Sequence, residues 1–198
     1  MRLIIAALAL LSLPVSAAEL LEITVDDEDG RYIMTTVTEF DAPRLGVFDV
    51  LTDYERFGRI SSVYDDAGFA EPSADGIPRV FTRVKGCVLF FCQTMDRTER
   101  LENDGLDRIR ATVEPGSSDF EYSVATWLLS ESDEGGTRVI YTVEMVPSFW
   151  VPPVIGPYVM KRKLRKGGRD AIERIEALAF ASTADLAVLR SRGLSGFD

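Results

Sequence analysis

Histidine is absent from the 198-residue sequence, which removes the usual general base at neutral pH and the commonest metal ligand. The serine pair Ser117-Ser118 lacks the context of a catalytic nucleophile. A solvated helix face explains the paired carboxylates Asp49 and Asp53. No cofactor motif is present either. The sequence therefore predicts no catalytic residue, no metal site and no cofactor.

Basic residues are in the minority, with 22 Lys and Arg against 32 Asp and Glu and a net charge of -10. Affinity for nucleic acid depends on clustered cations, so nucleic acid is not an expected partner. No linker rich in Pro, Gly or Ser divides the chain, and its length fits one domain. The sequence gives no indication of the oligomeric state.

Long apolar runs are also missing. The run Leu3 to Leu13 has 11 residues, whereas a bilayer span needs about 20. Arg2 precedes this run and the small residues Pro14 to Ala18 follow it, an order typical of a signal peptide rather than a membrane anchor. We expect residues 1–17 to be removed after export, with the periplasm as the destination and secretion as the alternative.

Cysteine occurs twice, at Cys87 and Cys92. Two nearby thiols in an oxidising compartment tend to pair, so we expect a disulfide. The ring it closes is short, and the chain-entropy model assigns it only about 2 kcal/mol. A shared metal ion is the alternative, but two thiolates without histidine supply too few ligands for a structural zinc site.

Alternating apolar residues and turn clusters predict an antiparallel sheet. The predicted strands cover residues 21–25, 31–40, 60–70, 78–86, 93–102, 106–114, 120–130 and 138–146. One or two short helices are expected over 42–57. A long amphipathic helix begins at Gly156-Pro157, and Ser182-Thr183 either ends it or caps a short helix that runs to Leu189.

The element order resembles the helix-grip fold of the START-like superfamily, which includes polyketide cyclases, plant allergens and lipid carriers. The resemblance covers about residues 30–181. Phe48 to Tyr54, after Asp41-Ala-Pro43, resembles the start of the coenzyme-Q-binding-like branch, and Gly168 to Ala179 resembles its terminal helix. The resemblance implies an α+β fold in which a curved sheet wraps a long C-terminal helix. It also implies a cavity between them for a lipid, sterol, quinone or polyketide.

On this basis residues 18–181 form the ligand-binding domain and 182–198 a C-terminal tail. Strand period leaves open which face of each strand points inward. The candidates for lining the cavity are Tyr122, Val124, Trp127, Tyr141 and Val143, and ordinary core packing is the alternative for all of them. Three charged residues within strands, Arg83, Arg97 and Glu99, are expected to face solvent in cross-strand pairs.

Three connections, at 87–92, 115–119 and 147–156, are predicted to share one end of the sheet because successive antiparallel connections alternate between ends. The first and third are apolar, and a basic run follows the third. The candidates for a cavity rim that docks on a membrane are Phe90, Phe91, Phe149, Trp150, Lys161, Arg162 and Lys163. Inward packing of the rings and a protein interface are the alternatives.

Three functions follow from these features. An exported binder or carrier of an apolar small molecule or lipid agrees with the signal peptide, the implied cavity and the apolar, basic rim. An enzyme of cyclase, dehydratase or hydrolase type would be favoured by a carboxylate buried in the cavity with a raised pKa. A scaffold protein would be favoured by an interior filled with side chains.

Overall fold

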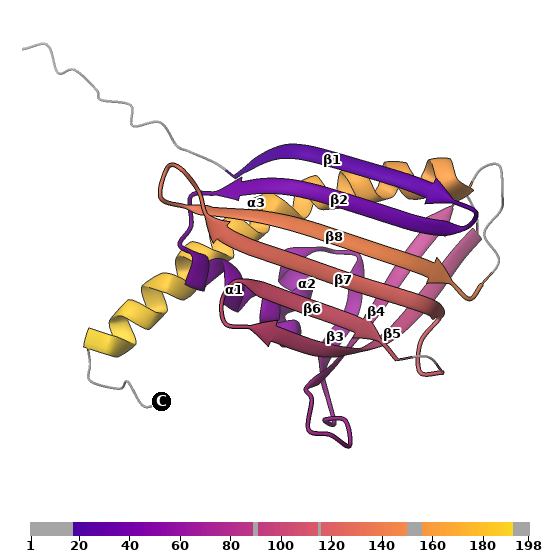
Figure 1. Ribbon diagram of the computed structural model, residues 1–198, viewed down its shortest axis with the longest axis horizontal. Coiled ribbons are helices and arrows are strands. Elements are labelled where there is room, and N and C mark those ends of the chain that lie inside the picture. The colour runs from indigo at the N-terminus through magenta and orange to yellow at the C-terminus, as the bar shows by residue number, and fades with distance from the viewer. Residues whose placement is uncertain (1–17, 89–90, 115, 150–155, 192–198) are drawn as a thin grey trace, which may run out of the picture.

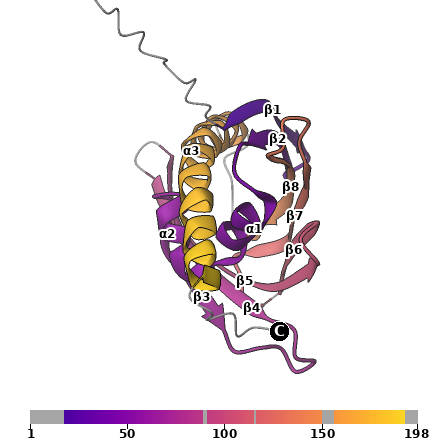
Figure 2. The ribbon, with the colours of Figure 1, turned by 90° about the vertical axis from the view of Figure 1, so that its left-hand side faces the viewer.

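The computed structural model describes residues 18–88, 91–114, 116–149 and 156–191. A curved antiparallel sheet wraps around a long helix, as Figure 1 and the end view in Figure 2 show. The predicted helix-grip α+β fold is therefore confirmed.

The strands are β1 (Glu19–Glu28), β2 (Arg31–Phe40), β3 (Tyr64–Ala70), β4 (Arg79–Val88), β5 (Phe91–Asp104), β6 (Arg108–Val113), β7 (Phe120–Glu131) and β8 (Thr137–Pro147). The signal peptide predicted for residues 1–17 lies outside the described residues.

The eight strands form one sheet in the order β1-β2-β8-β7-β6-β5-β4-β3. From β3 to β8 the chain meanders as predicted, and the hairpin of β1 and β2 then pairs with β8 through β2. The hairpin turns at Asp29 and Gly30, which have φ angles of 53° and 86°. Asp-Gly suits such a turn because both positions need a left-handed backbone.

One face of the sheet is concave and carries most of the core. On β2 the alternating residues Tyr32, Met34 and Phe40 are buried, and Met34 pairs with Val143 of β8. Further buried members of this face are Val25, Val80, Leu101, Ile109, Ala111, Val113, Ala125, Leu129, Val139 and Met145. Period-two alternation between this face and the solvated convex face is what the strand patterns predict.

The helix α3 (Gly156–Ser191) is continuous over 36 residues. Both alternatives predicted for Ser182-Thr183, an end of this helix or the cap of a separate short helix, were wrong, and the predicted tail from residue 182 is helical as far as Ser191. The Thr183 hydroxyl donates to the Ala179 carbonyl at 2.8 Å, and the Ser182 hydroxyl donates to Oδ2 of Asp49 at 2.8 Å. Both hydroxyls are thus satisfied without interrupting the helix. In Figure 1 the C-terminal end of α3 projects beyond the sheet.

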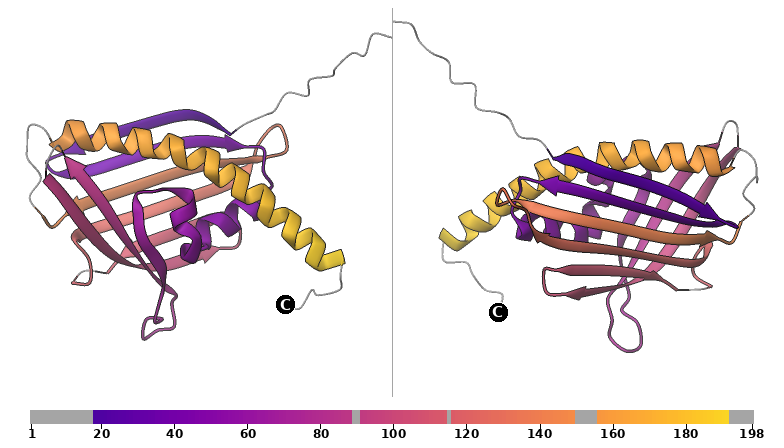
Figure 3. Two further views of the ribbon diagram at one scale, coloured as in Figure 1. Left: turned by 180° about the vertical axis from the view of Figure 1, so that it is seen from behind. Right: turned by 45° about the horizontal axis from the view of Figure 1, so that its top comes forward.

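The C-terminal half of α3 is anchored on the short helices α1 (Arg44–Thr52) and α2 (Phe57–Ile60), which the 3-10 helix η1 (Tyr54–Arg56) separates in the sequence. Gly46 of α1 lies against the Ala179 carbonyl, and Glu176 accepts a hydrogen bond from the Asp41 backbone N–H at 3.1 Å. The N-terminal half runs along β1, as Figure 3 shows from behind the molecule. The two halves of α3 therefore have different supports.

Burial raises the pKa of Glu176, although the Asp41 N–H opposes this. The folded protein therefore holds this proton more tightly than the unfolded chain, whose ordinary value is 4.5. The associated stability is present below that value and is lost as the pH rises through the folded pKa. We expect wild type to lose stability relative to Glu176→Gln over this window. Urea unfolding at a series of pH values measures the difference, and a pH-independent difference would contradict the assignment.

Candidate functional site

Three of the five residues predicted to line a cavity lie on the concave face. Trp127 and Tyr141 are paired across β7 and β8 with ring centroids 4.8 Å apart, and Val143 is buried on the same face. Tyr122 and Val124 point to the convex face instead, so their prediction was wrong. Tyr122 is 37% exposed and lies under the Arg31 guanidinium.

The physical reason is an irregularity in the register of β7 between Phe120 and Tyr122. Regular alternation would put these two residues on one face. The extra residue instead leaves Phe120 and Ser123 both buried, and the following inward positions are Ala125, Trp127 and Leu129. A β-bulge shifts every later side chain to the other face, and nothing in the local sequence announces it.

A buried ion pair occupies the concave face of β5. Nε of Arg97 lies 3.9 Å from Oε2 of Glu99, and the two side chains are 14% and 2% exposed. The Arg97 Nε–H also donates to the Thr82 hydroxyl at 3.3 Å. Its guanidinium carbon lies 5.7 Å from the centroid of the Phe120 ring. The prediction that Arg97 and Glu99 face solvent was wrong, whereas Arg83 does pair with Asp96 at the surface.

Three tyrosines interact electrostatically with this ion pair: Tyr54, Tyr64 and Tyr141. Burial is the main cause that raises the pKa of each tyrosine; among the smaller effects, the Glu99 carboxylate raises each pKa and the Arg97 guanidinium lowers it. All three hydroxyls therefore stay protonated and neutral. Burial acts to lower the pKa of Arg97, but Glu99 and the three tyrosines together more than offset this, so the pKa is raised overall. We call Tyr54, Tyr64, Thr82, Arg97, Glu99 and Tyr141 the inner polar cluster.

Two polar atoms on the concave face are buried without a hydrogen-bond partner among the described residues, Oε1 of Glu99 and Oγ of Ser123. An unsatisfied buried polar group costs about 1–3 kcal/mol, and more where the group is charged. Native proteins retain few such groups, and each requires a physical explanation. A bound molecule with its own polar groups would supply the missing partners.

The helices do not cover the whole concave face. α3 packs mainly on α1, β1 and β2, and only weakly on the central strands. Tyr64, Met95, Trp127 and Tyr141 stay partly exposed although they lie on the inner side of the sheet. This face therefore combines accessible ring surface with the inner polar cluster, as a site for an apolar molecule with a polar group requires.

No protein-family model and no curated protein matches the sequence. Several solved structures match the fold of the chain. A START superfamily protein from Mycobacterium smegmatis is 14% identical with a TM-score of 0.57, covering 73% of this chain and 94% of that one. The chain has the START-like helix-grip fold. Human STARD10 is 10% identical with a TM-score of 0.58, and the alignment covers 88% of this chain and 78% of the STARD10 chain.

A third structural match is to a protein described as an enzyme. The Zhui aromatase/cyclase from Streptomyces sp. R1128 is 15% identical with a TM-score of 0.51, covering 84% of this chain and 99% of its own. These identities are low, so the likeness shows the START-like fold alone. Fold does not determine function, which must be argued from the site.

The described strand ends that flank the three connections lie together at one end of the START-like sheet, as predicted. The Ser148 N–H donates to the Asp119 carbonyl at 3.0 Å, and the Asp119 N–H donates to the Asp96 carbonyl at 2.9 Å. Figure 1 shows the β4–β5 hairpin, the β6–β7 loop and the end of β8 at this end. We call it the rim end.

The rim candidates are only partly described. Phe149 packs edge-on against Phe120 with centroids 6.1 Å apart, as inward packing requires, and Arg162 is exposed. Phe90 and Trp150 lie outside the described residues. For Phe91, Lys161 and Lys163 only the backbone is described. Docking of this end on a membrane stays a prediction.

The two cysteines are cross-strand neighbours at the rim end. Cys87 of β4 pairs with Cys92 of β5 in the backbone register. Antiparallel partners have Cα atoms about 4.5–5.5 Å apart, which a disulfide can bridge. No cysteine of the described part is free. The disulfide itself stays a prediction.

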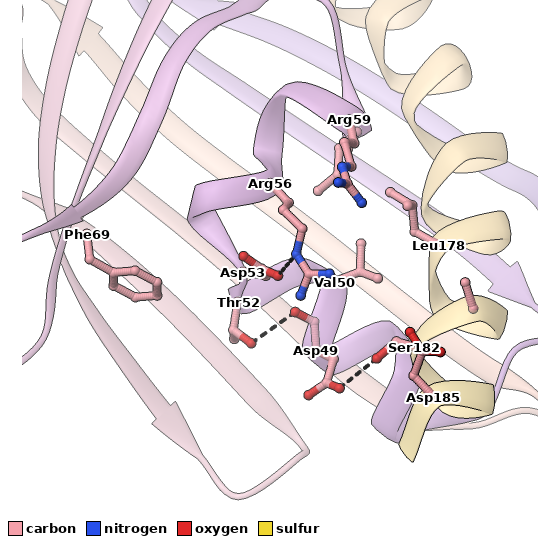
Figure 4. A pocket seen from close by; sticks show the side chains of 12 residues that line it. Asp49, Val50, Thr52, Asp53, Arg56, Arg59, Phe69, Leu178, Ser182 and Asp185 are labelled. Atoms are coloured by element: carbon pink, nitrogen blue, oxygen red, sulfur yellow. Dashed lines mark hydrogen bonds and ion pairs between the residues drawn. The ribbon is translucent and has the colours of Figure 1, made fainter. Parts of the chain in front are cut away.

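A separate surface pocket of about 410 Å³ lies between the short helices and the C-terminal half of α3 (Figure 4). Charged side chains line it, but several already have structural partners. Asp49 accepts from Ser182, and Asp53 pairs with Arg56. The Asp49 carboxylate thus joins α1 to α3, the Asp53 carboxylate holds the start of η1, and no buried unsatisfied atom of the described residues belongs to the pocket lining.

None of the described helices has an apolar stretch long enough to span a bilayer.

Proposed function

We propose that this protein binds an apolar ligand against the concave face of the sheet, with the inner polar cluster orienting the ligand's polar end. The observation that carries the proposal is the Glu99 carboxylate, which is buried beside Arg97 with one oxygen unpartnered among the described residues. Partly exposed rings of Trp127 and Tyr141 on the same face supply apolar contact area. The START-like fold is consistent with this use.

Native mass spectrometry of protein purified without detergent, followed by organic extraction, tests the proposal. We expect wild type to carry a stoichiometric apolar molecule. Trp127→Ala on the concave face should lose most of it, because the ring contributes a large apolar contact. Tyr122→Ala on the convex face is the matched control and should retain it. An empty wild type that also takes up no apolar probe would refute ligand binding.

We further propose that the protein is an exported carrier that meets an anionic membrane at the rim end. Support comes from the signal-peptide pattern of residues 1–17 and from exposed cations in the first turns of α3, among them Arg162, Arg165 and Arg169. Tyr158 in the same turns is 67% exposed. Cations beside aromatic side chains favour binding to anionic lipid surfaces. A Cys87–Cys92 disulfide would hold the neighbouring hairpin in shape.

Flotation with vesicles containing anionic lipid measures this docking. We expect wild type to float with the vesicles at low salt, and Arg162→Glu/Arg165→Glu to stay in solution. Arg108→Glu/Arg110→Glu on the convex face changes the charge equally and should float like wild type. Trp150→Ser should weaken binding if the rim also inserts its ring. Failure of wild type to float would end the docking proposal and leave ligand binding standing.

A cyclase-type enzyme is the second candidate, because one cluster holds both hydrogen-bond donors and an acceptor. The neutral hydroxyls of Tyr54, Tyr64 and Tyr141 can donate hydrogen bonds to a polarised substrate oxygen, and the Glu99 carboxylate can accept one. The aromatase/cyclase among the structural neighbours is consistent with this reading. Conversion of the captured ligand to a new product, lost in Glu99→Gln, would favour the enzyme over the carrier.

A further inference from the structure

The two unpartnered atoms on the concave face lie in one transverse row of the sheet. Glu99 of β5 pairs with Val113 of β6. Thr112 pairs with Val124 of β7, which places the next residue, Val113, beside Ser123. Neighbouring strands are about 4.8 Å apart, so the backbones of Glu99 and Ser123 are separated by about 10 Å. The residue between them, Val113, is apolar and buried.

The chemistry of the two atoms differs. The Glu99 carboxylate only accepts hydrogen bonds, so its Oε1 requires a donor. The Ser123 hydroxyl can donate or accept. The positive charge of Arg97 is already offset by Glu99, whose Oε2 lies 3.9 Å away. An anionic ligand group at Oε1 would meet a carboxylate instead of a free cation, and like charges repel strongly at a buried site.

We propose that the ligand is a neutral, two-ended molecule with a hydroxyl that donates to Glu99, an apolar body over Val113, and a second polar group that meets Ser123. This inference rests on the proposed function and narrows its ligand class to molecules whose polar ends are about two strand spacings, roughly 10 Å, apart. Neighbouring side chains cover both atoms in this structure, so binding requires them to shift. Trp127, Tyr141 and Phe149 are only partly buried, so they are the side chains that we expect to shift.

Isothermal titration calorimetry with four probes that share one apolar body measures what each polar group adds to the affinity. The probes are biphenyl, 4-hydroxybiphenyl, 4,4′-dihydroxybiphenyl and biphenyl-4-carboxylate. The oxygens of the dihydroxy probe are separated by about two strand spacings, roughly 10 Å. With wild type we expect each hydroxyl to tighten binding by about 5- to 10-fold, the usual gain from one satisfied hydrogen bond. The carboxylate should bind more weakly than the monohydroxy probe.

Two variants show which residue binds each polar end of the ligand. Ser123→Ala should remove only the gain from the second hydroxyl, so that the dihydroxy and monohydroxy probes bind equally. Glu99→Gln should reverse the preference and favour the carboxylate, because Arg97 then lacks its counter-charge. Ser130→Ala and Glu144→Gln, both away from the concave face, are the matched controls and should leave all four affinities unchanged.

The outcomes separate this inference from the proposed function. Tight binding that ignores the hydroxyls would overturn the two-ended ligand and keep the apolar binder. An equal loss for both hydroxylated probes in Ser123→Ala would also overturn it, because Ser123 would then act through packing alone. Binding of none of the four probes would overturn the inference, and the proposed function would fall with it only if native mass spectrometry also finds wild type empty.

Discussion

Gly46→Ala is expected to destabilise the protein by about 3 kcal/mol, because overpacking against backbone cannot be relieved by side-chain rotation. A Cβ at position 46 would collide with the Ala179 carbonyl oxygen and the Thr183 hydroxyl oxygen. α1 and α3 would have to separate to admit it. Separation would weaken the hydrogen bonds from Ser182 to Asp49 and from the Asp41 N–H to Glu176. Chemical denaturation followed by circular dichroism measures the change.

Gly58→Ala is the matched control for this substitution. Gly58 is an exposed glycine in α2, and a Cβ there meets nothing within 4 Å. Alanine should leave stability unchanged or raise it by up to about 1 kcal/mol through helix propensity. Equal destabilisation by the two substitutions would show that loss of glycine flexibility, and not the α1–α3 approach, dominates at Gly46.

The strands and the meander from β3 to β8 could be predicted from local pattern and turn chemistry, whereas the pairing of β2 with β8 joins segments far apart in the sequence. Period two and the turn clusters identified every strand of the meander, and the acidic Asp-Gly turn identified the β1–β2 hairpin. The helical spacing of apolar residues over 42–57 identified the short helices. These features depend on neighbours in sequence, so sequence alone could reveal them.

The site was harder to predict because it depends on which face points inward. The sequence did hold one usable signal on β5. Arg97 and Glu99 share period-two positions with Met95 and Leu101, whereas the intervening residues are all polar. Despite this alternation, Arg97 and Glu99 were predicted to face solvent, because buried charged side chains are rare. On β7 no such signal exists, since the irregularity after Phe120 reverses the faces.

The end of α3 illustrates a different limit. Ser182 and Thr183 are residues that favour helix termini when considered alone. Here the hydroxyl of Ser182 bonds to Asp49, a residue 133 positions earlier in the chain, and Thr183 bonds within its own helix. Only the tertiary contact with α1 shows that these hydroxyls are satisfied inside a continuing helix.

Arg97→Met is expected to cost about 3–5 kcal/mol, because it leaves the Glu99 carboxylate buried without its counter-charge. The neutral tyrosine hydroxyls nearby cannot replace a full positive charge. Arg83→Met is the matched control, since Arg83 pairs with Asp96 at the surface of the neighbouring strand. Exposed ion pairs contribute about 0–1 kcal/mol, so the control should change little.

A double substitution separates a buried-charge effect from a packing effect. Arg97→Met/Glu99→Leu removes both charges and should recover most of the lost stability, because an apolar pair can replace a buried ion pair. A cost that the double substitution does not relieve would mean that Arg97 stabilises the sheet through its packing against Phe120, and the inner polar cluster would lose its electrostatic basis.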